Sequence, residues 1–174
     1  MATNRAGDIM ISLDKYPHIP HWFSLRQGVA ELEKSTIEFK GRSSLPRALL
    51  VFDEKYRLLG VVRRRDILGA LEPNFLHDMH VADQRRVYDV DVDPDLVEVS
   101  SGKITRAIRE HSEIPISNVM IPIKATVDFE DHLFKVIHIM IRDDLNLIPV
   151  LKEGKVVGVV RSVDVFHEVA NILL

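Results

Sequence analysis

Two segments of the chain place an arginine three residues before an aspartate, a combination suited to binding an anion. Arg63 precedes Asp66, and Arg161 precedes Asp164. Arginine is a planar cation that pairs bidentately with phosphate, and a helix start beside it also favours negative charge. Anion binding is therefore one prediction for both segments. The alternatives are that the arginines are solvated or paired with the acidic arm at residues 87–99, and that the aspartates only cap helices.

The two segments belong to one internal repeat. Residues 59–68 match residues 157–166, with a shared core of glycine, two valines and arginine that leads to the aspartate. A buried apolar run, 48–53 or 147–151, precedes each core across a short polar connection, so each pair of runs is expected to close into a hairpin. Gly154 can supply the positive φ that such a turn requires. Helical spacing follows each aspartate, so each unit should end as strand, turn, strand and helix.

A longer amphipathic helix is expected before each hairpin. Ser24 and Gln27 form a capping box for the first helix, and Asp128 with Asp131 is expected to start the second. The distance from cap to core glycine is 36 residues in the first unit and 30 in the second. We expect a loop at 40–44 to hold the six additional residues.

The stretch between the repeats is patterned rather than featureless. Residues 87–99 alternate apolar and acidic residues, which indicates an extended strand or arm with an acidic side. Ile104, Ala107 and Ile108 mark a short helix after Gly102.

Bulk composition limits the class of protein. The chain has 174 residues, 46% of them hydrophobic, a formal charge of −3 and no cysteine. This composition predicts a globular protein without disulfides or thiolate metal sites, and without the overall basic field that would hold nucleic acid. The first residues lack the apolar region of a signal peptide, and no apolar run reaches the roughly 18 residues of a membrane span. We expect a soluble, cytoplasmic protein with no membrane partner.

Other candidate sites are weaker. His77 and His80 lie three residues apart beside Asp78 and Asp83, a spacing that could hold a metal ion. Surface histidines are commoner than metal ligands, so no metal site is predicted. The sequence contains neither a strained-turn nucleophile motif nor a glycine-rich phosphate loop, so no enzyme activity is predicted.

These features resemble the CBS domain family. The resemblance rests on the order βαββα, the strand that leads into the helix aspartate, the Ile148–Val150 strand, and Ser117–Pro122, which is similar to the opening motif of that domain. It implies an α/β (α+β) fold in which two βαββα CBS units pack as a pseudo-twofold pair. The expected divisions are a first unit at 8–73, an acidic arm and short helix at 74–116, and a second unit at 117–174.

The resemblance also implies a function. Clefts between paired CBS units commonly bind AMP, ADP or ATP, and sometimes S-adenosylmethionine or NAD(H), as regulatory ligands rather than required cofactors. The pairs often form homodimers. Because no effector domain is recognisable in the sequence, a sensor of this kind is expected to act through a separate effector protein, as yet unknown, or through its own oligomeric state.

In that family a serine or threonine three residues before the helix aspartate donates to phosphate, and the aspartate accepts from ribose hydroxyls. Arg63 and Arg161 stand at the hydroxyl position here, and Asp66 and Asp164 are kept. The remaining expected ligand-binding residues are Lys124, Ala125, Thr126, Val127, Asn146, Leu147, Ile148, Pro149 and Ser162 in the second cleft, and Ile19 and Ala48 in the first. The alternative for each apolar member is that it belongs to the core.

A second hypothesis remains open beside the sensor. Arginine is much longer than serine, so it could fill each cleft and leave a module that only dimerises or binds another protein. The clefts are also unequal, since Ser162 has Arg64 as its counterpart. The second cleft is therefore the favoured ligand site.

Overall fold

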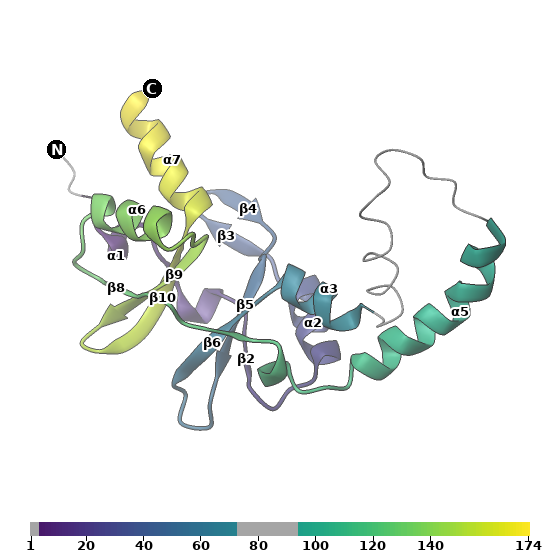
Figure 1. Ribbon diagram of the computed structural model, residues 1–174. Helices are drawn as coiled ribbons and strands as arrows, with labels where there is room; N and C mark the ends of the chain where they lie inside the picture. The colour runs from purple at the N-terminus through teal and green to yellow at the C-terminus, as the bar shows by residue number, and fades with distance from the viewer. Residues whose placement is uncertain (1–3, 73–93) are drawn as a thin grey trace.

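The computed structural model describes residues 4–72 and 94–174. Within these residues, two four-stranded sheets lie side by side, each with helices packed against it (Figure 1). The two sheets have equivalent strand orders, one parallel pair followed by two antiparallel pairs. This equivalence confirms the predicted α/β fold of two βαββα units.

The first sheet contains the strands of the first repeat. Its spatial order is β2 (His18–Pro20), β5 (Ala48–Phe52), β6 (Leu58–Arg63) and β7 (Ile121–Pro122). All five residues of β5 are buried, as expected for a central strand covered on both faces.

The second sheet repeats this arrangement. Its spatial order is β8 (Val127–Asp128), β9 (Leu147–Lys152), β10 (Lys155–Arg161) and β1 (Ile11–Ser12). The turn between β9 and β10 has positive φ at Glu153 and Gly154, which confirms the conformation predicted for that glycine. Both hairpins predicted from the repeat are present.

Each sheet takes its fourth strand from the part of the chain that otherwise forms the other sheet. β1 pairs with β10, and β7 pairs with β6. The repeated glycines allow this approach, because a Cβ at Gly158 would lie 2.4 Å from the Ile11 carbonyl oxygen and one at Gly60 would lie 2.6 Å from that of Ile121. Close strand packing is thus a physical reason for glycine in the repeat.

The helices follow the same duplication. Each repeat has a longer helix before its hairpin and another after it: α2 (Leu25–Lys34), α3 (Arg64–Leu71), α6 (Leu133–Arg142) and α7 (Ser162–Leu173). The short segments are α1 (Ala6–Ile9), η1 (Leu13–Lys15) and η2 (Ile116–Asn118). The capping box predicted for α2 is confirmed, since the Ser24 main-chain N–H donates to Gln27 at 2.8 Å and the Gln27 N–H donates to the Ser24 hydroxyl at 3.3 Å.

The start predicted for α6 is wrong. The helix begins at Leu133, and its N-cap is His132, whose Nδ1 accepts from the Phe134 main-chain N–H at 3.3 Å. Asp131 instead accepts from the main-chain N–H of Asp128, which closes a turn before the helix. A tight turn at these residues delays the helix by several positions.

The prediction for the segment between the repeats is partly wrong: Ile104, Ala107 and Ile108 are helical as expected, but the helix is much longer than predicted. α5 (Pro94–His111) is one 18-residue helix, so 94–99 are helical and Gly102 lies within the helix instead of preceding it. The residues at 87–93, and the histidines at 77 and 80, lie outside the described residues. α5 packs against α3 and extends away from the sheets (Figure 1).

The additional residues in the first unit form a hairpin rather than the predicted loop. β3 (Ile37–Phe39) pairs antiparallel with β4 (Arg42–Ser44), and the turn has positive φ at Lys40 and Gly41. Two consecutive residues of positive φ are the geometry of a tight hairpin turn, and glycine adopts it readily.

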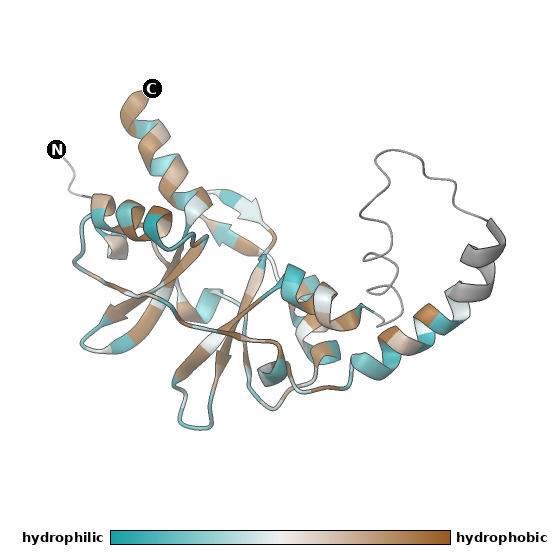
Figure 2. Cartoon of the chain, in the orientation of Figure 1, coloured by the Kyte–Doolittle hydropathy of each residue, from teal (hydrophilic) through white to brown (hydrophobic). Residues whose placement is uncertain are grey.

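Three apolar cores hold the molecule together. One lies within each unit, and the third lies between the sheets, where Ile11, Tyr16, Ile37, Leu50 and Val159 are buried together. Hydrophobic residues accordingly run along β5, β6, β9 and β10 (Figure 2). Because Ile37 belongs to the third core, the β3–β4 hairpin is anchored between the two units.

Candidate functional site

The arginine and aspartate of each repeat form an ion pair with each other. Arg63 donates from Nε and Nη2 to the two carboxylate oxygens of Asp66, both at 2.8 Å. Arg161 makes the same two bonds to Asp164, at 2.6 and 2.8 Å. This bidentate geometry follows from the sequence spacing, since residues three apart at a helix start face each other.

The aspartates do not occupy the N-cap position that the sequence suggested, although Asp66 does cap the start of α3 as part of a capping box. The N-cap residues are Arg63 and Arg161, the last residues of β6 and β10. Asp66 lies three residues into its helix start, where its carboxylate also accepts from the main-chain N–H of Arg63 at 2.9 Å. The hydrogen bonds from Arg63 hold the pKa of Asp66 below its ordinary value, and those same bonds raise the pKa of Arg63.

The two ion pairs differ in burial. The side chains of Arg63 and Asp66 are 45% and 13% exposed, whereas those of Arg161 and Asp164 are 11% and 5% exposed. A buried pair is held more firmly, because removing one partner leaves the other charge without water or a counter-ion.

The β3–β4 hairpin covers the second pair. Ser44 at the end of β4 accepts a hydrogen bond from Arg161 Nη1 at 2.8 Å. At the hairpin turn, Lys40 Nζ lies 2.5 Å from Glu168 of α7, and Glu168 also accepts from Asn4 at 3.2 Å. The hairpin thereby joins the first unit to the helix that begins at the second ion pair.

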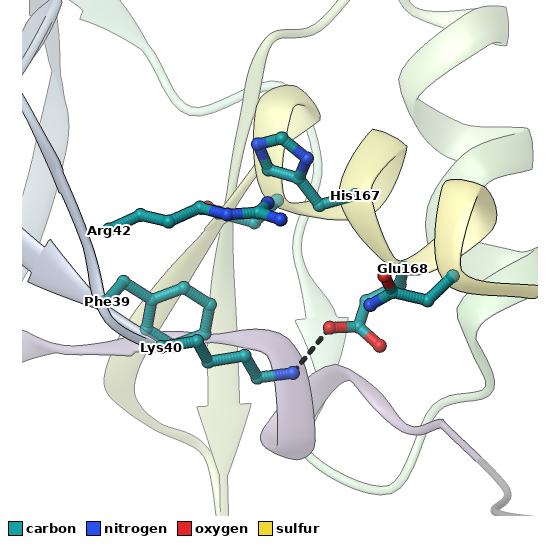
Figure 3. Close-up of a pocket in the computed structure, with 7 residues that line it drawn as sticks. Phe39, Lys40, Arg42, His167 and Glu168 are labelled. Atoms are coloured by element: carbon teal, nitrogen blue, oxygen red, sulfur yellow. Dashed lines mark hydrogen bonds and ion pairs between the residues drawn. The ribbon is translucent and has the colours of Figure 1, made fainter. Parts of the chain in front are cut away.

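A cavity of about 110 Å³ remains between the hairpin and α7. Its lining residues are Phe39, Lys40 and Arg42 from the hairpin, and Asp164, His167, Glu168 and Asn171 from α7 (Figure 3). In the close-up the Arg42 side chain extends toward the His167 ring, while Lys40 reaches Glu168 on the other side. The cavity thus brings basic groups from one unit to the helix of the other.

Sequence reasoning missed the hairpin residues of this cavity. Nothing in the sequence separates Phe39, Lys40 and Arg42 from an ordinary polar loop. A signal for the α7 residues was present, because positions 164, 167, 168 and 171 follow the spacing of one helix face.

A second cavity of about 330 Å³ lies beside α2 and η1. It is lined by Asp14, Lys15, Tyr16, Pro17, His18, Glu31, Lys34, Ser35 and Thr36. It contains no residue of either repeated motif, so we centre the candidate site on the smaller cavity.

Part of the predicted second cleft is brought together at the start of α7. Leu147 pairs in register with Arg161, and Asn146 accepts from the main-chain N–H of Ser162 at 2.9 Å through its carbonyl. The Ser162 hydroxyl also donates to the Asn146 side chain at 3.3 Å. These polar groups therefore lie at the open end of the β9–β10 hairpin, beside the Arg161–Asp164 ion pair.

Other members of the predicted set are packed in the cores. Val127 and Ile148 are buried in the second core and Ala125 packs against it, Pro149 is buried where it pairs with Val159, and Lys124 and Thr126 are exposed. For Val127 and Ile148 the core alternative therefore accounts for the side chain. Contact of the remaining backbone or exposed groups with a ligand stays a prediction.

The first cleft is lined differently. Ala48 pairs in register with Arg63, and its carbonyl oxygen accepts from the hydroxyl of Tyr16 at 3.0 Å. Ile19 is buried in the first core. Tyr16 lies in the core between the sheets, where burial raises the pKa of its hydroxyl. Its hydroxyl thus stays protonated and ties the inter-unit core to β5.

Two negative findings hold for residues 4–72 and 94–174. No group of three or more histidine, cysteine, aspartate or glutamate side chains is placed to hold a metal ion. None of the helices there is long and apolar enough to cross a membrane.

Comparisons with known proteins agree with this architecture. The CBS domain family matches residues 112–171, which include β7 through most of α7. A search of curated proteins found no match.

Solved structures match over nearly the whole chain. The CBS-pair protein CBSX2 from Arabidopsis thaliana has a TM-score of 0.63 at 16% identity, covering 99% of this chain and 98% of that one. A structure of CBSX2 in complex with AMP has a TM-score of 0.62 at 16% identity, covering 98% of each chain. The cytosolic domain of the Mg²⁺ channel MgtE in complex with ATP has a TM-score of 0.59 at 19% identity; 95% of this chain aligns with 48% of that one. At these identities the likeness shows the fold.

Proposed function

We propose that this chain is a regulatory, non-catalytic module of the CBS-domain type that binds an adenosine-type nucleotide between its units; the match of residues 112–171 to the CBS domain family and the fold of a CBS pair support the proposal. The observation that carries the proposal is the cavity at Asp164, which both units line and to which the hairpin contributes Lys40 and Arg42. Two solved structures of the same fold are complexes with AMP or ATP. A cytoplasmic location remains part of the same proposal.

The size of the cavity suggests how a nucleotide would enter. A volume of about 110 Å³ is well below the roughly 300 Å³ at which small-molecule pockets begin. The phosphate end fits inside, and the nucleoside requires the exposed turn of the hairpin to shift. Ile37 would remain anchored in the inter-unit core during such a shift.

A shift of this kind gives a route for regulation. Two contacts join the units here, one between Arg161 and Ser44 and one between Lys40 and Glu168. A ligand that replaces either contact changes how firmly the units are joined. Typical couplings between sites are about 1 to 3 kcal/mol, which a few such contacts can supply. The readout would be a change in a homodimer or in an effector protein.

The test is isothermal titration calorimetry of the protein against AMP, ADP, ATP, S-adenosylmethionine and NADH. Adenosine serves as the phosphate-free control. We expect saturable binding by at least one phosphate-bearing nucleotide and weaker binding of adenosine. Absence of heat and of any thermal stabilisation with all five ligands would contradict the sensor.

A second candidate function is an assembly module without a ligand. Both arginine–aspartate pairs are closed, so the groups predicted to read phosphate and ribose already satisfy each other. In addition, α6 and α7 expose large apolar side chains, among them Phe134, Ile141, Phe166 and Leu173. An apolar surface of this kind favours contact with another protein surface, and a second copy of this chain is the simplest partner.

A further inference from the structure

The second cleft needs a cation other than Arg161 if it is to bind phosphate. Two of the N–H groups of Arg161 are bonded to Asp164 and a third to Ser44, and the side chain is largely buried. Asp164 uses both carboxylate oxygens in the same pair. A phosphate that used Arg161 would have to leave the Asp164 carboxylate buried without a partner, which is strongly unfavourable.

Arg42 is placed to take that role. It is exposed on β4, and within residues 4–72 and 101–174 its guanidinium makes no hydrogen bond or ion pair with another side chain. The side chain extends into the cavity toward His167 of α7 (Figure 3). His167 likewise has no hydrogen-bond partner among those residues, so a donor from each unit points at the same space.

The charges around the cavity favour an anion. Arg161 neutralises Asp164, and Lys40 neutralises Glu168, so Arg42 is left as one uncompensated positive charge in the lining. The two carboxylates in the lining therefore do not exclude an anion. The volume of about 110 Å³ suits a phosphoryl group and little more.

We propose that the cavity between the β3–β4 hairpin and α7 is a phosphoryl-binding site, with Arg42 and His167 as its direct ligands. Arg42 binds two phosphate oxygens through its planar fork, and the His167 imidazole N–H donates to a third. The anion thereby bridges the first unit to α7. The inference rests on the proposed nucleotide-binding function, and it assigns phosphate recognition to the inserted hairpin instead of the repeated motif.

The experiment compares the whole protein with Arg42→Gln and with Arg106→Gln as the matched control. Arg106 is an exposed arginine on α5 that is paired with Glu110. α5 itself lies apart from β3 and β4 (Figure 1). Both variants lose one positive charge, so a general electrostatic effect would appear in both. Because Arg42 has no structural partner among the described residues, its replacement should leave the melting temperature within about 2 °C of the parent.

The probes are inorganic phosphate, AMP and adenosine, each titrated by calorimetry. We expect Arg42→Gln to weaken inorganic phosphate and AMP by about tenfold or more, which is the usual effect of losing a charge-assisted hydrogen bond. Arg106→Gln should bind both as the parent does. Adenosine should bind equally to all three proteins, since it lacks the group that Arg42 contacts.

The outcomes separate this inference from the function on which it rests. If the parent binds AMP and Arg42→Gln binds it equally well, the inference is overturned while the nucleotide sensor stands. If the parent binds inorganic phosphate through Arg42 but no nucleotide, the site stands as a phosphate site and the nucleotide function is overturned. Binding of neither probe by the parent overturns both.

Discussion

Arg63 and Arg161 occupy equivalent positions in the repeat, yet they carry different structural roles. Each pairs with the aspartate three residues later, but only Arg161 is covered by the β3–β4 hairpin. The exposed pair can exchange its partner for water or for a ligand at little cost, whereas the buried pair cannot. The same motif therefore forms a partly exposed ion pair in one unit, and in the other unit it forms a buried ion pair that also contacts the hairpin.

This difference predicts unequal effects of removing the two aspartates. Asp164→Ala should lower the free energy of unfolding by about 3 to 5 kcal/mol, because it leaves Arg161 buried without a counter-ion. Asp66→Ala should cost about 1 kcal/mol or less, because Arg63 is substantially exposed. Urea unfolding of the two variants measures both values.

The double variant Arg161→Met with Asp164→Leu provides the control. Replacing both charges by apolar groups of similar size should recover most of the stability lost in Asp164→Ala. Equal losses for Asp66→Ala and Asp164→Ala would show that the hairpin does not bury the second pair.

At the level of secondary structure, the two units are joined by an exchange of strands. β1 completes the second sheet and β7 completes the first, so neither sheet is made from one continuous stretch of chain. Gly60 and Gly158 stand where these strands approach most closely, and any side chain there meets a carbonyl oxygen. The repeated glycine that revealed the duplication is thus also a packing requirement between the two halves.

A methyl group at position 158 should weaken the pairing of β1 with β10. Gly158→Ala places a Cβ 2.4 Å from the Ile11 carbonyl oxygen and 2.9 Å from the Met10 sulfur, so β1 must move. We expect a loss of about 1 to 3 kcal/mol in urea unfolding and faster amide exchange in β1.

Gly69→Ala is the matched control for that substitution. Gly69 lies in α3, and a Cβ there meets no atom within 4 Å. Since alanine is favoured over glycine in helices, this variant should be neutral or more stable by up to about 1 kcal/mol. A similar loss in both variants would argue against steric crowding at β1.

The molecule as a whole presents unequal outer faces on its two units. In the second unit α6 and α7 expose Phe134, Ile141 and Phe166, each about 70% exposed or more. The difference lies between α6 and α2, whose corresponding outward positions include Arg26, Gln27, Glu33 and Lys34, since on α3 Leu68 is exposed as Phe166 is on α7. A contact through the apolar helices alone would leave the cavity at the hairpin beside the interface, because α7 contributes to both.

The exposed apolar surface of α6 and α7 predicts a homodimer that one charged substitution in this surface would disrupt. The parent should sediment as a homodimer, and Phe134→Lys should shift it toward monomer because a lysine ammonium would be desolvated in the interface. Trp22→Lys is the control, since Trp22 is also an exposed aromatic residue but lies in the first unit. A monomeric parent, or equal behaviour of the two variants, would exclude this interface.

Local sequence was sufficient for much of the architecture. The repeat, the two hairpins and the Ser24 capping box depend on spacings of a few residues and on alternation between apolar and polar positions, and all are confirmed. The arginine–aspartate spacing also determined the ion pairs, because side chains three residues apart at a helix start face each other. The predicted starts of α6 and α5 failed where turn chemistry and long-range packing competed with local preference.

The candidate site depended on contacts that spacing does not encode. The six additional residues look like a loop, and only Ile37, buried in the core between the sheets, shows why they form a hairpin. Their position over α7 then decides which cation is free: Arg161 is enclosed by Asp164 and Ser44, and Arg42 is left facing the cavity. Burial and pairing between residues more than 100 positions apart arise only when both units pack. The sequence therefore determined the two units, while the tertiary structure determined which of their charges can bind a ligand.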